Sequence, residues 1–291
     1  MMPVPKALKE KDATMTKAPT NAQSSASFLK MKRQGQKISM ITAYDYSMAR
    51  CIANSDIDII LVGDSLGMVV LGYDSTLQVT TEDIIYHSAA VRRGAPQAFI
   101  IADMPYLSYH LSDEDTKQNA AALIVSGKAN AVKLEGGSAS RLEAIRAIVD
   151  IEIPVCAHLG LTPQSVHRFG GYKVQGKSVA DHDEILSQAK AVEQAGAFML
   201  VLEGIPEELG KLISETLTIP TIGIGAGRFT DGQVLVYHDM LGYSDMQAKF
   251  VKQYAQLNTT ITKALDEFSA EVRSGSFPTE KHIYYPISNK E

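Results

Sequence analysis

Residues 57–65 read Ile-Asp-Ile-Ile-Leu-Val-Gly-Asp-Ser, a short, mostly apolar run that ends in a carboxylate and a hydroxyl. The run is too short for a helix, and its β-branched and aliphatic side chains favour a strand buried on both faces. Similar runs occupy residues 38–44, 98–103, 131–135, 153–158, 198–203, 221–225 and 234–238. The sequence therefore predicts eight short strands of a parallel sheet.

Amphipathic stretches separate these runs. Helices are expected to begin near Thr80, Ser112, Asp181, Pro206 and Ser244, the last of them ending at about Arg273. Eight strand–helix units in about 240 residues favour a closed (β/α)8 TIM barrel of the α/β class. An open, doubly wound sheet would carry a glycine cluster after its first strand, whereas residues 42–45 read Thr-Ala-Tyr-Asp.

The two ends of the chain differ from this alternating region. Residues 1–27 contain few large apolar side chains and are predicted to form a disordered N-terminal tail. Residues 28–273 are predicted to form a single barrel domain, and residues 274–291 a C-terminal tail. Whether that second tail packs loosely or docks on a neighbouring subunit is left open.

Net charge, hydropathy and cysteine content disfavour several classes of protein. The net charge of the 291 residues is −5, which disfavours a nucleic-acid-binding protein. No apolar run approaches the roughly 18 residues that a membrane-spanning helix needs. Cys51 and Cys156 both lie in apolar segments, so we expect buried, reduced thiols in a cytoplasmic protein.

Ionisable side chains cluster at the carboxyl ends of the predicted strands. Five successive runs end with six of them, namely Asp64, Asp103, Lys133, Glu135, His158 and Glu203. A (β/α)8 barrel places its active site at this end of its strands. Because side chains alternate along a strand, Lys133 and Glu135 share one face, which we expect to be the barrel interior. The sequence thus predicts four carboxylates, one lysine and one histidine in one cavity.

Carboxylates held this close need a counter-ion, and a hard divalent cation with oxygen ligands, typically Mg²⁺, is the expected one. Each residue also has a simpler interpretation, because a lone aspartate often caps a helix and a lone histidine often lies in a core. Six such residues at five strand ends favour a site over capping. A glycine-rich loop at 169–177 is a candidate lid or subunit contact.

Several blocks of sequence resemble one family. They are Ile41-Thr-Ala-Tyr-Asp-Tyr46, Leu61-Val-Gly-Asp-Ser-Leu-Gly-Met68, Val132-Lys-Leu-Glu-Gly136, His158-Leu-Gly-Leu-Thr-Pro-Gln-Ser165, Phe169-Gly-Gly-Tyr-Lys-Val-Gln-Gly176 and Ile222-Gly-Ile-Gly-Ala-Gly227. In this order they are similar to the ketopantoate hydroxymethyltransferase (3-methyl-2-oxobutanoate hydroxymethyltransferase) family. The resemblance covers about residues 28–260.

The resemblance implies a barrel of the phosphoenolpyruvate/pyruvate superfamily that acts in pantothenate synthesis. Such enzymes transfer a one-carbon unit from methylenetetrahydrofolate to 3-methyl-2-oxobutanoate and form 2-dehydropantoate. It also implies one Mg²⁺ per subunit, a cytoplasmic location and a homo-oligomer, commonly a decamer. Small molecules, a 2-oxo acid and a folate, are the expected partners, with no nucleic acid and no membrane.

Roles for individual residues follow from the same resemblance. Asp64 and Asp103 are the implied metal ligands, with Glu135 near the metal through water. The implied substrate-binding residues are Asp64, Ser65, Asp103, Lys133, Tyr44 and His158. Among these, Ser65 and Lys133 hold the substrate carboxylate, while Tyr44 and His158 line the keto-acid site. Glu203 is the implied catalytic base.

The sequence departs from the family pattern in two places, a longer N-terminal tail and the stretch 246–254, which lacks a proline before Lys249-Phe-Val251. Two alternatives stay open. One is another Mg²⁺-dependent 2-oxo-acid lyase or mutase of the superfamily, which would often carry a loop cysteine. The other is a catalytically silent barrel that only binds a 2-oxo acid, for which at least one site residue should be missing.

Overall fold

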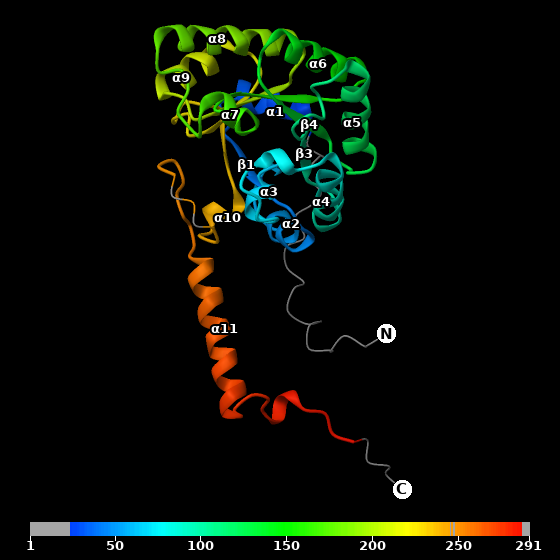
Figure 1. The fold of residues 1–291 in the computed structure, drawn as a ribbon, viewed down its shortest axis with the longest axis vertical. Helices are drawn as coiled ribbons and strands as arrows, with labels where there is room; N and C mark the ends of the chain where they lie inside the picture. Colours follow the sequence, from blue (N-terminus) through cyan, green and yellow to red (C-terminus); the bar gives the residue numbers. More distant parts are fainter. Residues whose placement is uncertain (1–23, 245, 247, 287–291) are drawn as a thin grey trace. The chain divides into compact units, whose positions relative to one another are not determined.

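The computed structural model describes residues 24–244, 246 and 248–286. Eight parallel strands close into a barrel in sequence order, as predicted (Figure 1). They are β1 (Ile38–Thr42), β2 (Ile59–Val62), β3 (Phe99–Asp103), β4 (Ala131–Glu135), β5 (Val155–Gly160), β6 (Met199–Glu203), β7 (Thr221–Ile224) and β8 (Gly232–Leu235). Ile38 closes the ring by donating its backbone N–H to the carbonyl of Asp231, at 3.0 Å.

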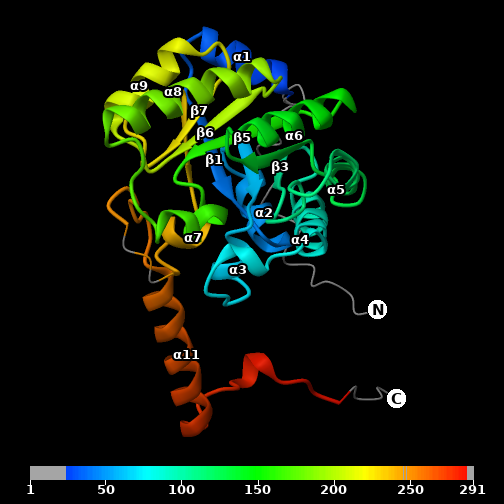
Figure 2. The same ribbon diagram turned by 45° about the horizontal axis from the view of Figure 1, so that its top comes forward.

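Helices alternate with the strands along the chain, with α4, α5, α6, α8 and α9 flanking the barrel in Figure 2. They are α1 (Ser25–Arg33), α2 (Tyr46–Ala53), α3 (Leu66–Val69), α4 (Thr81–Gly94), α5 (Asp113–Val125), α6 (Ala139–Asp150), α7 (Val166–Phe169), α8 (Val179–Gln194), α9 (Glu207–Thr216), α10 (Tyr237–Met240) and α11 (Leu257–Ser274). Short 3₁₀ helices are η2 (Thr76–Gln78), η3 (Pro163–Ser165) and η4 (Glu280–His282). Within the described ranges, every helix is too short or too polar to cross a membrane.

Contacts divide the chain into a unit that ends at Val234 and a second unit that begins at Leu235. The boundaries predicted for the two tails stay predictions. Helix α1 starts at Ser25, inside the segment predicted as a tail. Ser24 caps the helix, because its backbone N–H donates to Ser27 Oγ and its carbonyl accepts the hydroxyl hydrogen of Ser27. Residues 1–23 lie outside the described residues.

The predicted eighth strand and last helix are both misplaced in the sequence analysis. Strand β8 begins at Gly232, where a Cβ would lie only 2.3 Å from the carbonyl of Ile38, and residues 237–240 form helix α10 instead of continuing the strand. The helix expected from Ser244 begins at Leu257. The backbone N–H groups of Tyr254 and Leu257 bond back to the carbonyls of Met240 and Leu241, which keeps this stretch from becoming helical.

The barrel interior is apolar at the end where the strands begin. Inward side chains of β1 to β8 form one buried cluster there, which also contains Phe28 of α1. Phe28 packs edge-on against Phe99 with ring centroids 5.0 Å apart. Helix α1 therefore closes this end of the barrel with an aromatic plug, and burial of such a ring is worth on the order of 2 kcal/mol.

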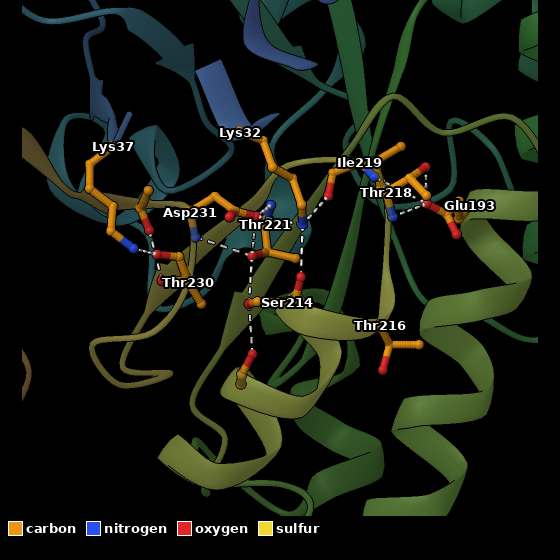
Figure 3. A network of polar contacts seen from close by, with 12 residues as sticks. Lys32, Lys37, Glu193, Ser214, Thr216, Thr218, Ile219, Thr221, Thr230 and Asp231 are labelled. Carbon is orange, nitrogen blue, oxygen red and sulfur yellow. Dashed lines mark hydrogen bonds and ion pairs between the residues drawn. The ribbon is translucent and has the colours of Figure 1, made fainter. Parts of the chain in front are cut away.

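A polar network ties α1 to the same end (Figure 3). Lys32 Nζ lies 2.8 Å from Asp231 Oδ2 and also donates to the carbonyls of Ser214 and Ile219, at 2.8 and 2.9 Å. Asp231 Oδ2 in turn accepts from the backbone N–H and the hydroxyl of Thr221, at 2.8 and 2.9 Å. We call these five residues the base network.

The two cysteines differ. Cys156 is buried inside β5, as predicted, and burial raises the pKa of its thiol to about 12. Cys51 is exposed, so the prediction that it is buried is wrong. It lies on α2, where Ala49 and Ile52 form the buried face and Cys51 is outside it.

Candidate active site

Along several strands, every second side chain points into the barrel, and the last of these, at the carboxyl end of the strand, is ionisable. On β3 the inward side chains Phe99 and Ile101 are followed by Asp103, and on β6 Met199 and Val201 are followed by Glu203. The same alternation on β4 and β5 leads to Lys133, Glu135 and His158. Pairing sets Asp103 beside Lys133 and Glu135 beside His158. We call Asp64, Asp103, Lys133, Glu135, His158 and Glu203 the mouth cluster.

The first part of the cluster joins two aspartates and the lysine. Lys133 Nζ lies 2.9 Å from Asp103 Oδ1, and both side chains are buried. The backbone N–H of Asp64 donates to Asp103 Oδ2 at 3.0 Å. This approach requires Gly63, because a Cβ there would lie 2.9 Å from Ser65 Oγ and 3.3 Å from Asp103 Oδ2.

The second part of the cluster is centred on His158. Its Nδ1 lies 3.4 Å from Glu135 Oε1, and its Nε2 lies 3.2 Å from Glu203 Oε2. Burial and the charge of Lys133 lower the pKa of His158, but its contacts with Glu135 and Glu203 outweigh them and raise it to about 9. The two glutamates on either side of the ring thus favour the imidazolium form of His158, although Lys133 Nζ also lies 3.4 Å from its Nδ1.

The cluster carries an excess of negative charge. Burial, followed by the charges of Asp103 and Glu135, raises the pKa of Asp64 well above its usual value. Burial lowers the pKa of Lys133, but the charges of Asp103, Glu135 and Asp64 raise it overall, so the lysine stays charged. Four carboxyl groups share the cluster with only one lysine and one histidine, so acidic groups outnumber basic ones.

Asp64 and Asp103 fit a hard divalent cation by donor type, burial and this charge excess. Across residues 24–244, 246 and 248–286, however, three or more His, Cys, Asp or Glu side chains nowhere form a ready-made metal site. Mg²⁺ commonly takes one or two carboxylates and completes its shell with substrate and water, so a third protein ligand is not required. Glu135 does not join Asp64 and Asp103 in a three-ligand group.

Two further predicted residues lie together. The hydroxyls of Tyr44 and Ser65 are 2.8 Å apart. Tyr44 is fully buried just after β1, whereas Ser65 is half-buried at the start of α3. The pair adds two hydroxyl groups beside Asp64.

Two buried residues that were not predicted from the sequence touch the cluster. Gln164, in η3 after β5, donates its Nε2–H to Asp64 Oδ2 at 2.8 Å and its backbone N–H to Glu135 Oε2 at 3.0 Å. Tyr109, in the loop after β3, donates its hydroxyl to Gln164 Oε1 at 2.5 Å. Both lie outside the strand ends on which the prediction relied, although Gln164 belongs to a block that carries the family resemblance.

The glycine-rich loop also reaches the cluster. Tyr172 Oη lies 3.7 Å from Met68 Sδ of α3. Burial, then the charges of Asp64, Glu203 and Glu135, raises the pKa of Tyr172. The interpretation of this loop as a lid stays a prediction.

Fold and site together define an α/β barrel that carries an acidic, metal-suited centre at the carboxyl ends of its strands. Solved structures agree with this class. A phosphoenolpyruvate phosphomutase from Streptomyces platensis subsp. rosaceus aligns with a TM-score of 0.59 and 13% identity, over 90% of this chain and 92% of that one. A 2,3-dimethylmalate lyase of the PEP mutase/isocitrate lyase superfamily aligns with a TM-score of 0.57 and 14% identity, over 89% and 91%. At these identities the likeness establishes the fold alone.

Sequence comparison identifies the family. The model of the ketopantoate hydroxymethyltransferase family matches residues 23–280, and the chain belongs to this family. The chain is 54% identical to the 3-methyl-2-oxobutanoate hydroxymethyltransferase of Clostridium beijerinckii, over 88% of this chain and 94% of that relative. It is also 54% identical to the enzyme of the same name from Geobacter metallireducens, over 88% and 96%. The predicted resemblance is therefore confirmed.

Proposed function

We propose that the protein is a 3-methyl-2-oxobutanoate hydroxymethyltransferase that uses methylenetetrahydrofolate and acts in pantothenate synthesis. The observation that carries this reaction is the presence of a partly buried base and an acidic centre in one cluster, with Glu203 beside His158 and Asp64 beside Asp103. The relatives, which share more than half of their residues with the chain, carry this name.

Glu203 is the proposed base for the proton on C3 of the keto acid. Its side chain is partly accessible, at 16%, so a substrate can reach it, and His158 Nε2 fixes its Oε2 at 3.2 Å. His158 is a poor alternative base, because a pKa of about 9 keeps it protonated at neutral pH. The carbanion left on C3 bonds to the methylene carbon of the folate as one of that carbon's two C–N bonds breaks. Water then supplies the hydroxyl as the second C–N bond breaks, and tetrahydrofolate leaves with the C3 proton and one proton of the water on its two nitrogens.

Lys133 and Ser65 are the proposed partners of the substrate carboxylate. Lys133 has three N–H donors, so its ion pair with Asp103 leaves donors for a substrate. Tyr44 orients Ser65 through their 2.8 Å hydrogen bond. Asp64 and Asp103 would hold Mg²⁺, with Glu135 acting through water, and the ion would supply Lewis-acid stabilisation of the negative charge on the keto oxygen.

A lyase or mutase of the same superfamily is disfavoured by the cysteines. Cys156 lies in the interior of β5 with a pKa of about 12, and Cys51 lies on α2. Neither is on a loop at the mouth. A silent barrel is disfavoured because all six predicted members of the mouth cluster are present and buried or partly buried together.

A steady-state assay with 3-methyl-2-oxobutanoate and methylenetetrahydrofolate tests the proposed reaction. We expect 2-dehydropantoate as the product, loss of turnover after chelation of divalent metal, and recovery on addition of Mg²⁺. Full activity in metal-stripped protein would contradict the metal part of the proposal. No product under any metal condition would contradict the reaction itself.

We further propose a cytoplasmic homo-oligomer, with the family's common decamer as the expected size. Helix α11 supports self-association, because its spacing puts four exposed apolar side chains on one face, Ile261, Leu265, Phe268 and Val272. Light scattering coupled to gel filtration would measure the size, and a monomer at micromolar concentration would contradict the proposal.

A further inference from the structure

Gln164 connects two acids of the mouth cluster although it lies on neither of their strands. It belongs to η3, and its side chain is buried. Its backbone N–H donates to Glu135 Oε2 at 3.0 Å, and its Nε2–H donates to Asp64 Oδ2 at 2.8 Å. One residue of the loop after β5 therefore links the end of β4 to Asp64, two residues beyond the end of β2.

The surroundings of Gln164 fix which way its amide points. Nε2 has two partners that can only accept, the carboxylate of Asp64 and the carbonyl of Met104 at 3.0 Å. The amide nitrogen must therefore lie on this side, and Oε1 on the other. There the hydroxyl of Tyr109 accepts the N–H of Glu135 at 3.2 Å and donates its own hydrogen to Oε1 at 2.5 Å.

The neutral amide of Gln164 orients the carboxyl group of Asp64 without neutralising it, as a cation would. Lys133 partly neutralises Asp103, since its ammonium lies 2.9 Å from Oδ1. Gln164 donates a neutral N–H to Oδ2 of Asp64, so the carboxyl group is oriented without a positive charge placed beside it. Partners of this kind hold metal ligands in place, and their loss typically lowers metal affinity or activity about 10- to 100-fold.

We propose that Gln164, itself held by Tyr109, is a positioning residue that orients the carboxylate of Asp64 for a divalent cation and the keto acid. This inference rests on the proposed function. Gln164 acts through Asp64 and not on the reacting atoms, and Tyr109 acts on Asp64 through Gln164. The two residues should therefore behave as one unit when either is changed.

The test is a double-mutant cycle on the full chain. Calorimetric titration with Mg²⁺ is carried out in the presence of 3-methyl-2-oxobutanoate on wild type, Gln164→Leu, Tyr109→Phe and the double variant. We expect Gln164→Leu to weaken Mg²⁺ binding about 10- to 100-fold. Tyr109→Phe, which removes one hydroxyl, should weaken it about 2- to 10-fold. The double variant should match Gln164→Leu to within about twofold, because independent sites add and members of one unit do not.

Ser214→Ala is the matched control. It also removes a buried hydroxyl, one that lies 2.7 Å from Thr221 Oγ1 at the far end of the barrel. It should lower the unfolding temperature and leave Mg²⁺ affinity unchanged, which separates positioning from general stability. If Gln164→Leu does not fold, Tyr109→Phe decides the question alone.

Normal Mg²⁺ affinity in Gln164→Leu or in Tyr109→Phe would overturn the positioning role, as would a double variant whose loss is the product of the two single losses. These outcomes are separate from the proposed reaction. Wild type that makes no 2-dehydropantoate, but whose variants lose Mg²⁺ affinity as expected, would contradict the reaction and support the positioning of Asp64.

Discussion

The two ends of the barrel each contain a lysine–aspartate pair, partly buried at the base and buried at the mouth, and the two pairs have opposite surroundings. At the base, Lys32 and Asp231 lie 2.8 Å apart among carbonyl, hydroxyl and N–H partners. At the mouth, Lys133 and Asp103 lie 2.9 Å apart beside two further carboxyl groups, those of Glu135 and Asp64. The base pair is balanced in charge and hydrogen bonding, whereas the mouth pair is part of an acidic excess.

This difference explains how one fold combines stability with chemistry. Balanced polar groups stabilise a buried position, but like charges there cost free energy until a ligand arrives. The base network holds α1 across the end of the barrel, as Figure 3 shows for Lys32, Ser214 and Asp231. The mouth cluster is held in place by the strands despite its own repulsion, and this stored cost makes cation binding favourable.

The largest effect is expected at Glu203. Glu203→Gln keeps the shape and an acceptor for His158 but cannot take a proton. With Mg²⁺ and the keto acid alone, wild type should exchange the C3 proton with D₂O, as measured by proton NMR. The variant should bind the keto acid nearly as well and lose exchange by about 10²- to 10⁴-fold, as is typical for a positioned general base.

Two other outcomes would assign Glu203 differently. Exchange near the wild-type rate would make it a structural residue. Loss of Mg²⁺ affinity together with exchange would make it a metal ligand. In either case the base would have to be found elsewhere in the mouth.

Matched Asp→Asn substitutions at the two ends should change stability in opposite directions. Asp231→Asn leaves Lys32 without its charge partner and should lower the free energy of unfolding by on the order of 2 kcal/mol, as for the loss of a charged hydrogen-bond partner at a partly buried position. Asp64→Asn removes a carboxyl group whose pKa is raised by burial and by Asp103. It should therefore raise the free energy of unfolding by roughly 1 kcal/mol in metal-free protein.

Urea titrations of both variants and wild type at pH 7 would measure these changes. Asp231→Asn should keep its transferase activity once folded, and Asp64→Asn should lose it. Destabilisation by Asp64→Asn would show that the charges of the mouth cluster are balanced in the metal-free protein. The two ends of the barrel would then not differ in charge balance.

Ligand binding should stabilise the protein through the mouth alone. A ligand at about 100 times its Kd stabilises the folded state by about 2.7 kcal/mol. Mg²⁺ with the keto acid should therefore raise the unfolding temperature of wild type and of Asp231→Asn alike. Scanning calorimetry should show no such rise in Asp64→Asn; an equal rise there would place the cation elsewhere.

Much of the mouth was predictable because it depends on alternation along strands. Once residues 99–103 and 131–135 are read as parallel strands, Asp103 and Glu135 must point the same way as the core side chains before them. Barrel closure then brings consecutive strand ends together. The same reasoning places His158 and Glu203, and the observed register confirms their positions.

What could not be predicted depends on loop conformation and on close backbone contacts. Gln164 reaches Asp64 because the loop after β5 turns into η3, and no periodic pattern reveals that turn. Strand β8 begins at Gly232 because only glycine fits against Ile38, whereas propensity argues against glycine in a strand. Lys133 was expected at the substrate carboxylate, and its ion pair with Asp103 was not foreseen.

The smallest expected effect concerns His110, which lies behind Tyr109 at the edge of the mouth. Its ring packs against Tyr109 and Tyr106 with centroids 4.3 and 5.0 Å away. Burial, followed by the charge of Arg141, lowers the pKa of His110 from 6.5 to about 4. Its protonation therefore favours the unfolded chain, so its contribution to stability is complete above pH 6.5 and is lost as the pH falls towards 4.

His110→Phe keeps a ring in this place and removes the titration. Urea titrations between pH 7 and pH 4 should show that wild type loses more stability than the variant over this window. The difference should stay below about 1 kcal/mol, because solvent screens the charge of a half-buried ring. All other ionisable groups are the same in the two proteins, so the comparison isolates His110. Parallel losses in the two proteins would mean that His110 takes up its proton in the folded state as readily as in the unfolded chain.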